Sequence, residues 1–254
     1  MKRYRLYILD LDGTLYRGSE ALPRALESVQ TLESNDAQIR YLTNNSGQTR
    51  QFYAEKLQEM GFDARPDWIY SSASGAAKIC KEENLWPVFL VGDPGLKQTF
   101  VECGVPVINS ESDSGEPANA VVAGICRAFT YAWLNASLQQ ILSGAKFIAT
   151  NTDATYPVEG GRVEPGAGAI VSAIQTASGV APRVIGKPEP LLIRMIMEDA
   201  GAVPEETLVV GDRYETDILA GIRAGVDAHL VLTGVTQRAP EGVSWSSDLG
   251  GLVC

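Results

Sequence analysis

Apolar residues follow two spacings along this chain, and the two alternate. Short runs rich in β-branched and aromatic residues predict strands, and segments whose apolar positions recur every three or four residues predict helices. Near the start, strand patterns cover residues 4–12 and 39–45, and helical patterns cover residues 23–34 and 49–61. Near the end, strand patterns cover residues 183–188, 207–212 and 229–234, and helical patterns cover residues 191–201 and 216–225. This alternation predicts an α/β fold in which both ends of the chain contribute to one parallel sheet.

A middle block carries strands and helices of its own. Its strand patterns cover residues 87–92, 106–109, 119–125 and 146–151, and a helical pattern covers Tyr131 to Leu142. The stretch 109–119 is polar, contains Gly and Pro and has no periodicity, so we expect an exposed loop there. We therefore predict a second, smaller α/β domain, residues 81–182, inserted into a core formed by residues 1–80 and 183–254.

The charge of the chain narrows the set of partners. It has 254 residues, with 21 Lys and Arg against 31 Asp and Glu, and a net charge of -10. No segment concentrates basic residues, so we expect no nucleic-acid partner. No apolar run reaches the length of a membrane span, and the first residues meet an aspartate too early for a signal peptide, so we expect a cytoplasmic protein without a membrane partner. If the substrate is an anion, a protein this acidic needs a cation at the binding site to offset the repulsion. The net charge is therefore a first indication of a bound metal.

Cysteine and histidine chemistry is scarce in this sequence. The four cysteines, at positions 80, 103, 126 and 254, are widely separated, so we expect reduced thiols and no zinc site. The single histidine, His229, lies in an apolar run, and we assign it to structure. Mechanisms that need a histidine base are therefore disfavoured.

Two carboxylates follow the first predicted strand directly. Strand alternation turns the side chains of Asp10 and Asp12 to the same side, at the carboxyl edge of the sheet, where open α/β sheets bind ligands. Gly13 comes next and allows a sharp turn that points successive amides at an anion. A capped turn into a helix explains the same residues. This motif therefore indicates a ligand site only in combination with the residues at the other strand ends.

Polar residues also end three further predicted strands. Thr43 and Asn44 can donate hydrogen bonds to phosphoryl oxygens, Lys187 can supply a positive charge, and Asp212 and Asp217 can bind a metal. Each is ordinary alone, since a turn, a solvated lysine or a helix N-terminus explains it as well. Together they predict a phosphoryl-transfer site in which Asp10, Asp212 and Asp217 hold Mg²⁺ while Lys187 and Thr43 bind the phosphate.

These motifs resemble those of the haloacid dehalogenase-like hydrolases, in particular the NagD-like branch that includes para-nitrophenyl phosphatases. The resemblance rests on residues 10–18, 43–46, 186–190 and 211–221, in that order. Residues 149–170 resemble the cap domain of this branch. The resemblance implies a Rossmann-like core with an inserted α/β cap that covers the active site and selects the substrate.

The resemblance also implies roles for single residues. Asp10 would attack phosphorus and form an aspartyl-phosphate, and Asp12 would protonate the leaving alcohol and then activate water. The backbone carbonyl of Asp12 would join the metal ligands, and Asp217 would bind the metal directly or through water. Asn151 and Asp153 would face the substrate from the cap, although a polar turn at a strand end explains them equally well.

One residue departs from the pattern of this branch. Cys126 occupies a position at which relatives usually have Asp, which bears on any substrate preference transferred from them. Dimers through the cap are also known in the branch, so a homodimer is an expectation for this chain.

The sequence thus predicts a Mg²⁺-dependent phosphatase of small phosphate esters, without choosing between sugar phosphates, nucleotide monophosphates, phosphoglycolate and para-nitrophenyl phosphate. A phosphotransferase or mutase would use the same aspartyl-phosphate. A phosphorylation-controlled receiver module also gathers acids, Thr and Lys at strand ends, but Asp12 and the large insertion favour the hydrolase. A binding protein that has lost turnover is disfavoured because every expected catalytic residue is present.

Overall fold

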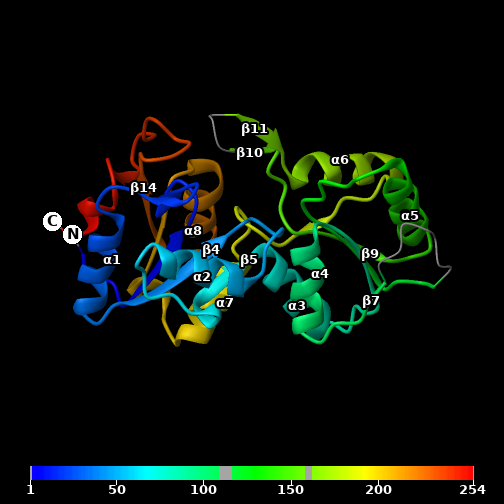
Figure 1. Ribbon diagram of the computed structural model, residues 1–254, viewed down its shortest axis with the longest axis horizontal. Coiled ribbons are helices and arrows are strands. Elements are labelled where there is room, and N and C mark those ends of the chain that lie inside the picture. The colour runs from blue at the N-terminus through cyan, green and yellow to red at the C-terminus, as the bar shows by residue number, and fades with distance from the viewer. Residues whose placement is uncertain (1, 109–115, 158–161, 254) are drawn as a thin grey trace. The chain divides into compact units, whose positions relative to one another are not determined.

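The computed structural model describes residues 2–108, 116–157 and 162–253, and these form two compact units (Figure 1). The first unit consists of Met1–Thr43, Gln51–Tyr70 and Lys187–Cys254. The second unit consists of Asn44–Arg50 and Ser71–Gly186. Among the helices of the described residues, none is both long enough and apolar enough to cross a membrane.

A six-stranded sheet organises the described part of the first unit, with the strand order β15-β14-β13-β1-β4-β5. Its strands are β1 (Leu6–Asp10), β4 (Gln38–Thr43), β5 (Ile69–Ser71), β13 (Thr207–Gly211), β14 (Asp227–Val231) and β15 (Ser244–Ser246). Strand β1 runs parallel to β4 on one side and to β13 on the other. The predicted parallel sheet built from both ends of the chain is therefore confirmed. The strand order reverses at β1, and the carboxyl edge beside such a strand is where α/β sheets bind ligands.

Helices and short turns connect the strands of this sheet. They are α1 (Ala25–Ser34), α2 (Arg50–Glu59), α7 (Leu191–Ala200), α8 (Leu219–Ala224) and the turns η1 (Pro66–Trp68), η3 (Pro204–Glu206), η4 (Tyr214–Ile218) and η5 (Leu249–Leu252). A two-stranded hairpin, β2 (Tyr16–Arg17) with β3 (Glu20–Ala21), follows β1 in the chain. Helix α7 ends where Gly201 adopts a φ of 60°, a conformation that favours glycine.

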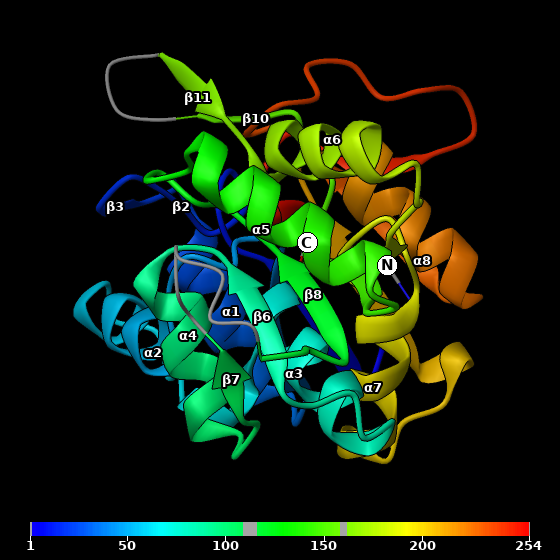
Figure 2. The ribbon, with the colours of Figure 1, turned by 90° about the vertical axis from the view of Figure 1, so that its right-hand side faces the viewer.

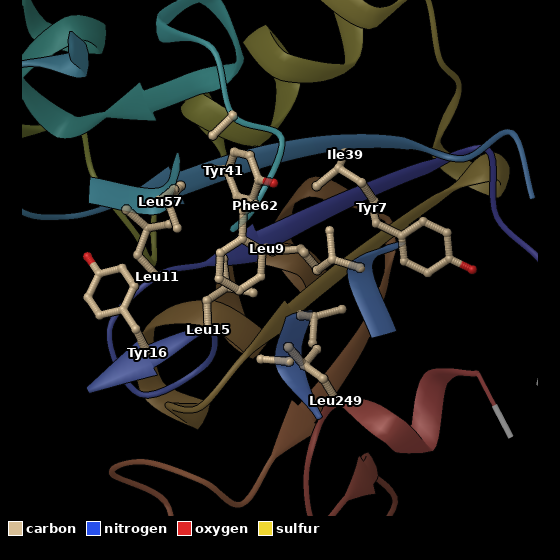
Figure 3. Close-up of a cluster of buried hydrophobic side chains, with 14 of the residues drawn as sticks. Tyr7, Leu9, Leu11, Leu15, Tyr16, Ile39, Tyr41, Leu57, Phe62 and Leu249 are labelled. Atoms are coloured by element: carbon tan, nitrogen blue, oxygen red, sulfur yellow. The ribbon is translucent and has the colours of Figure 1, made fainter. Parts of the chain in front are cut away.

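The core explains why β1 is apolar at every position before Asp10. Tyr7 and Leu9 belong to one buried cluster, together with residues of α1, β4, α2 and η5 (Figure 3). Leu6 and Ile8 alternate with them and are also completely buried, so they face the other side of the sheet. A strand buried on both faces needs a continuous apolar sequence, which is what LYIL provides.

The second unit is also α/β. Its described part contains a five-stranded sheet in the order β12-β9-β8-β6-β7, in which all neighbours are parallel. The strands are β6 (Val88–Val91), β7 (Val107–Ile108), β8 (Ala120–Ala123), β9 (Lys146–Ala149) and β12 (Arg183–Val184). Helices α3 (Ser72–Glu82) and α4 (Pro94–Glu102) cover one face, and α5 (Tyr131–Leu142) and α6 (Ala167–Ser178) cover the other (Figures 1 and 2). An antiparallel pair, β10 (Thr155–Pro157) with β11 (Val163–Pro165), completes the unit.

Local chemistry sets the beginnings of two of these helices. The helix predicted over Tyr131–Leu142 is confirmed as α5, and the Thr130 side chain accepts a hydrogen bond from the Trp133 amide at its start. Helix α3, which the sequence patterns did not predict, begins with a capping box in which Ser71 and Ser74 exchange side-chain and backbone hydrogen bonds.

One sequence-based assignment is wrong. The strand pattern before Lys187 was expected to join the sheet built from the two ends of the chain, but β12 pairs with β9 in the sheet of the second unit. A strand of only two residues carries too little pattern to indicate which sheet it joins. Most of the loop predicted over 109–119 lies outside the described residues, as does Cys254.

The described cysteines and the histidine are buried or half-buried. Cys80 and Cys126 are buried, Cys103 is half-buried, and none of these three is in a disulfide. His229 on β14 is 1% exposed, and its two ring nitrogens lie 2.8 Å from the hydroxyls of Ser244 and Ser246.

Candidate active site

A lysine joins two carboxylates at the carboxyl end of β1. The Lys187 ammonium lies 2.5 Å from Oδ1 of Asp10 and 2.6 Å from Oδ1 of Asp217, and all three side chains are nearly or fully shielded from solvent. Asp10 is the last residue of β1, and Lys187 lies four residues before α7. Buried charges of this kind are stable only when they are paired. The structure thus brings together three of the residues that the sequence singled out.

Asp212 and Asp217 reach the same cluster from the segment that follows β13. Asp217 lies in η4, a π-helical turn, and its Oδ2 accepts a hydrogen bond from the Arg213 amide at 2.9 Å. One oxygen from each of Asp10, Asp212 and Asp217 lies within 4.8 Å of the others. This wide turn is rare in proteins and is found mostly at functional sites.

Glycines make the space for these carboxylates. A Cβ on Gly211 would lie 2.2 Å from Cγ of Asp217, and a Cβ on Gly234 would lie 1.9 Å from Oδ2 of Asp212. Gly13 has a φ of +83°, and a Cβ there would lie 2.6 Å from the same Asp212 oxygen. The cluster therefore depends on three positions without side chains, and only Gly13 also requires the left-handed conformation.

The electrostatics of the cluster fit a divalent cation. Three carboxylates face one ammonium group, which leaves an excess of two negative charges when all are ionised. Burial raises the pKa of Asp10 well above its ordinary value, an effect that Lys187 opposes and Asp217 and Asp212 reinforce. Burial and then the charge of Asp217 raise the pKa of Asp212 to about 6. A hard cation at this place would balance the excess charge, and carboxylate oxygens are the ligands it prefers.

Asp12 has different surroundings from Asp10. Its side chain is exposed, and its Oδ2 accepts a hydrogen bond from the Tyr16 hydroxyl at 3.3 Å. The Lys56 ammonium lies 3.8 Å from the centre of the Tyr16 ring. Desolvation by the surrounding protein raises the pKa of Asp12, although Lys56 and the Tyr16 hydroxyl oppose the rise. A solvent-accessible carboxyl that holds its proton more tightly than usual is suited to general acid catalysis.

The remaining predicted residues divide between the two units. Thr43 is buried at the end of β4, one residue beyond the position that pairs with Asp10. Asn44 belongs to the second unit, where its side-chain amide donates to Asp153 at 3.0 Å and its carbonyl accepts from Asn151 at 2.7 Å. Oδ1 of Asn151 also accepts from the Asp153 amide at 3.1 Å. Asn44, Asn151 and Asp153 thus form one hydrogen-bonded cluster.

Comparisons with known proteins agree with this geometry. A model of the haloacid dehalogenase-like hydrolases matches residues 7–106, and a second model of related hydrolases matches residues 184–247. The 5'-nucleotidase YutF of Bacillus subtilis is 38% identical over 239 residues, which cover 94% of this chain and 91% of that protein. The chain belongs to the haloacid dehalogenase-like hydrolases.

Two further proteins refine its place among these hydrolases. The acid sugar phosphatase of Staphylococcus epidermidis is 38% identical over 237 residues, which cover 93% of this chain and 89% of that protein. The solved structure of NagD from E. coli superposes with a TM-score of 0.85 at 30% identity and covers 98% of each chain. The NagD-like resemblance of the motifs is therefore confirmed, as is the hydrolase fold.

Cys126 of this hydrolase packs in the apolar core of the second unit, where it is 6% exposed. The next residue, Arg127, is held by Asp93, whose Oδ1 accepts from the Arg127 amide at 2.8 Å and whose Oδ2 pairs with the guanidinium. The guanidinium also donates to the Tyr156 hydroxyl at 2.9 Å. A carboxylate from another segment, Asp93, thus binds the arginine that follows the atypical cysteine.

Sequence reasoning missed several groups that contact the loops carrying the candidate acids. Tyr16 and Lys56 adjoin Asp12, and a backbone amide of the segment 232–237 contacts Asp212. An amide carries no side-chain pattern, so nothing in the sequence points to that contact directly. The one available indication was the pair of residues Thr233 and Gly234 at the end of the strand pattern predicted over 229–234.

Proposed function

We propose that this hydrolase is a Mg²⁺-dependent phosphatase that hydrolyses small phosphate monoesters through an aspartyl-phosphate on Asp10. The observation that carries the proposal is the position of Lys187, which lies 2.5 Å from Asp10 and 2.6 Å from Asp217 beside the third acid, Asp212. A buried lysine can bind a dianionic phosphoryl group, and three neighbouring carboxylates can bind a cation. The similarity to a 5'-nucleotidase, YutF, and to an acid sugar phosphatase supports phosphate-ester hydrolysis.

In the first step, an Asp10 carboxylate oxygen attacks phosphorus, and the bond between phosphorus and the ester oxygen breaks. Asp12 transfers its proton to the departing oxygen, so that a neutral alcohol leaves. The raised pKa of Asp12 favours this role because it increases the fraction of the acid that is protonated near neutral pH. Lys187 and Thr43 bind phosphoryl oxygens as negative charge accumulates on them.

In the second step, Asp12 accepts a proton from a water molecule that attacks the aspartyl-phosphate. The bond between phosphorus and Asp10 breaks, inorganic phosphate leaves, and both carboxyl groups return to their starting states. The different surroundings of the two acids support the division of labour. Asp10 is paired with Lys187 and shielded, whereas Asp12 is exposed to solvent and therefore accessible to water and to a leaving group.

Asp10, Asp212 and Asp217 would hold Mg²⁺ in this proposal, together with the backbone carbonyl of Asp12. Bound there, the ion would supply positive charge that lets a phosphate dianion approach an otherwise acidic cluster. The three glycines at positions 13, 211 and 234 support the assignment, because they let Asp212 and Asp217 enter a space that a side chain would fill.

The second unit would act as the cap, which was predicted over residues 81–182, although this unit also contains residues 44–50, 71–80 and 183–186. Asn44, Asn151 and Asp153 would contribute to phosphate or substrate binding from the hydrogen-bonded cluster that they form there. The substrate would be a sugar phosphate, a nucleotide monophosphate or a similar small ester. A cytoplasmic location, a homodimer through the cap, and the lack of nucleic-acid and membrane partners complete the proposal.

Phosphate release from a panel of esters tests the proposal. The panel includes para-nitrophenyl phosphate, sugar phosphates, nucleoside monophosphates and phosphoglycolate, each measured with Mg²⁺ and with EDTA. We expect release that requires Mg²⁺, is lost in Asp10→Asn, and persists in Asp67→Asn, which changes an exposed aspartate in the same way. Transfer of phosphate to an added sugar in place of water would instead show a phosphotransferase, and metal-independent release would contradict the role of Mg²⁺.

A further inference from the structure

The segment 232–237, between β14 and β15, contacts both loops that carry the acids of the candidate site. It belongs to none of the motifs used so far, because its contacts to those loops involve backbone groups and the hydroxyls of Thr233 and Thr236. Its side chains range from half-buried to exposed. We call this segment the 232–237 loop.

Its first attachment is to the loop that follows β1. The Thr233 hydroxyl donates to the carbonyl of Gly13 at 2.5 Å, and the Thr233 carbonyl accepts from the Arg17 guanidinium at 2.6 Å. Gly13 directly follows Asp12 and adopts a left-handed conformation. Thr233 is therefore hydrogen-bonded to both Gly13 and Arg17. These two bonds fix the turn that follows Asp12.

The second attachment is to Asp212. The Val235 amide donates to Oδ2 of Asp212 at 2.6 Å, and the Thr236 amide donates to the Asp212 carbonyl at 3.0 Å. The first of these bonds occupies one carboxylate oxygen and leaves the other for a cation. Gly234 permits the approach, since a Cβ there would lie 1.9 Å from the same Oδ2.

We propose that Thr233 is a positioning residue, which fixes the 232–237 loop between Gly13 and Asp212 and thereby orients the Asp212 carboxylate toward the bound cation. The cation is the one in the proposed function, so the inference extends that proposal to residues outside its motifs. Thr233 itself contacts neither cation nor substrate. Its hydroxyl holds the backbone from which the Val235 amide reaches Asp212, and partners of this kind govern the affinity of a metal site.

Isothermal titration calorimetry of the purified protein with Mg²⁺ tests this role without any dependence on turnover. We expect Thr233→Val, which keeps the shape and removes the hydroxyl, to weaken Mg²⁺ binding by about tenfold. Thr233→Ser retains the hydroxyl and should bind Mg²⁺ within about threefold of wild type. The matched control is Thr31→Val in α1, an exposed threonine whose hydroxyl donates to the Glu27 carbonyl of its own helix, and this variant should bind Mg²⁺ like wild type.

Unchanged Mg²⁺ affinity in a folded Thr233→Val protein would overturn the inference, and so would equal weakening in Thr233→Val and Thr233→Ser. If Thr233→Val does not fold, Arg17→Met takes its place, because it removes only the exposed donor to the Thr233 carbonyl. We then expect severalfold weaker Mg²⁺ binding, and wild-type affinity would overturn the inference. A wild-type protein that binds Mg²⁺ but hydrolyses no ester would refute the proposed function while leaving this test valid.

Discussion

The Lys187 ammonium lies 2.5 Å from Oδ1 of Asp10, although 177 positions separate the two residues in the chain. The same ammonium lies 2.6 Å from Oδ1 of Asp217. Asp10 and Asp217 together raise the pKa of Lys187, even though burial alone would lower it. The lysine is therefore fully charged at neutral pH, and it holds two acids from distant segments at one edge of the sheet.

Lys187→Met should both destabilise the protein and stop its reaction. Removing one partner of a buried ion pair leaves the carboxylates of Asp10 and Asp217 uncompensated, which costs about 3 kcal/mol of unfolding free energy. Loss of the charge that stabilises phosphoryl oxygens should lower kcat by about 10²-fold or more. Urea unfolding and phosphate release measure the two effects, with exposed Lys97→Met as the control. Wild-type kcat in Lys187→Met would contradict the role given to this residue.

Mg²⁺ should restore part of the stability that Lys187→Met loses. A divalent cation among Asp10, Asp212 and Asp217 reduces the repulsion that the missing ammonium leaves behind. We therefore expect Mg²⁺ to raise the melting temperature of Lys187→Met, measured by calorimetry against EDTA. An identical melting temperature with and without the ion, in this variant and in wild type, would argue against a cation site at these acids.

The cluster of Asn44, Asn151 and Asp153 should depend on the amide of Asn151. Asn151 is 4% exposed, and its Nδ2 donates to the Asn44 carbonyl at 2.7 Å. Asn151→Asp places a carboxylate oxygen against that carbonyl, so we expect a loss of about 2 kcal/mol or more in unfolding free energy. Asn135→Asp, at an exposed position in α5, serves as the control. Equal stability of the two variants would show that the hydrogen bond contributes nothing.

His229 should make the stability of the protein fall between neutral and acidic pH. Burial lowers its pKa from 6.5 to about 4, so the unfolded chain binds a proton at a pH where the folded protein does not. Protonation therefore favours unfolding as the pH falls from 6.5 toward 4, and the loss approaches about 3 kcal/mol. Urea unfolding from pH 7 to pH 4 should show a smaller decrease for His229→Gln than for wild type. Parallel pH profiles would contradict this assignment.

Most residues of the candidate site could be predicted from the polar residues at the ends of apolar strands. Asp10, Thr43 and Asp212 come at or directly after apolar strands, and parallel strands of one sheet place their carboxyl ends at one edge. Asp217 was also predicted, because it lies only five positions after Asp212 in the chain. The alternation of strands and helices gave the parallel sheet for the same reason, since burial on both faces requires uninterrupted apolar runs.

The sequence could not indicate to which of the two units a short segment belongs. β12 has two residues, and its pairing with β9 depends on the whole surrounding fold. Asn44 directly follows Thr43 in the chain, yet it belongs with Asn151 and Asp153 through hydrogen bonds across more than a hundred residues. Contacts made by backbone groups, such as the Val235 amide on Asp212, are equally hidden because any residue can provide them.

The central claim is that Asp10 becomes phosphorylated during turnover, and a trapped intermediate tests it most directly. In Asp12→Asn the base that activates water is missing, whereas para-nitrophenolate leaves without needing a proton, so only the second step should stall. After this variant reacts with para-nitrophenyl phosphate and Mg²⁺, mass spectrometry of an acid digest should find the phosphoryl group on the peptide that contains Asp10. The double variant Asp10→Asn, Asp12→Asn should carry none. A phosphoryl group on another residue, or none in Asp12→Asn while wild type turns over, would contradict the account.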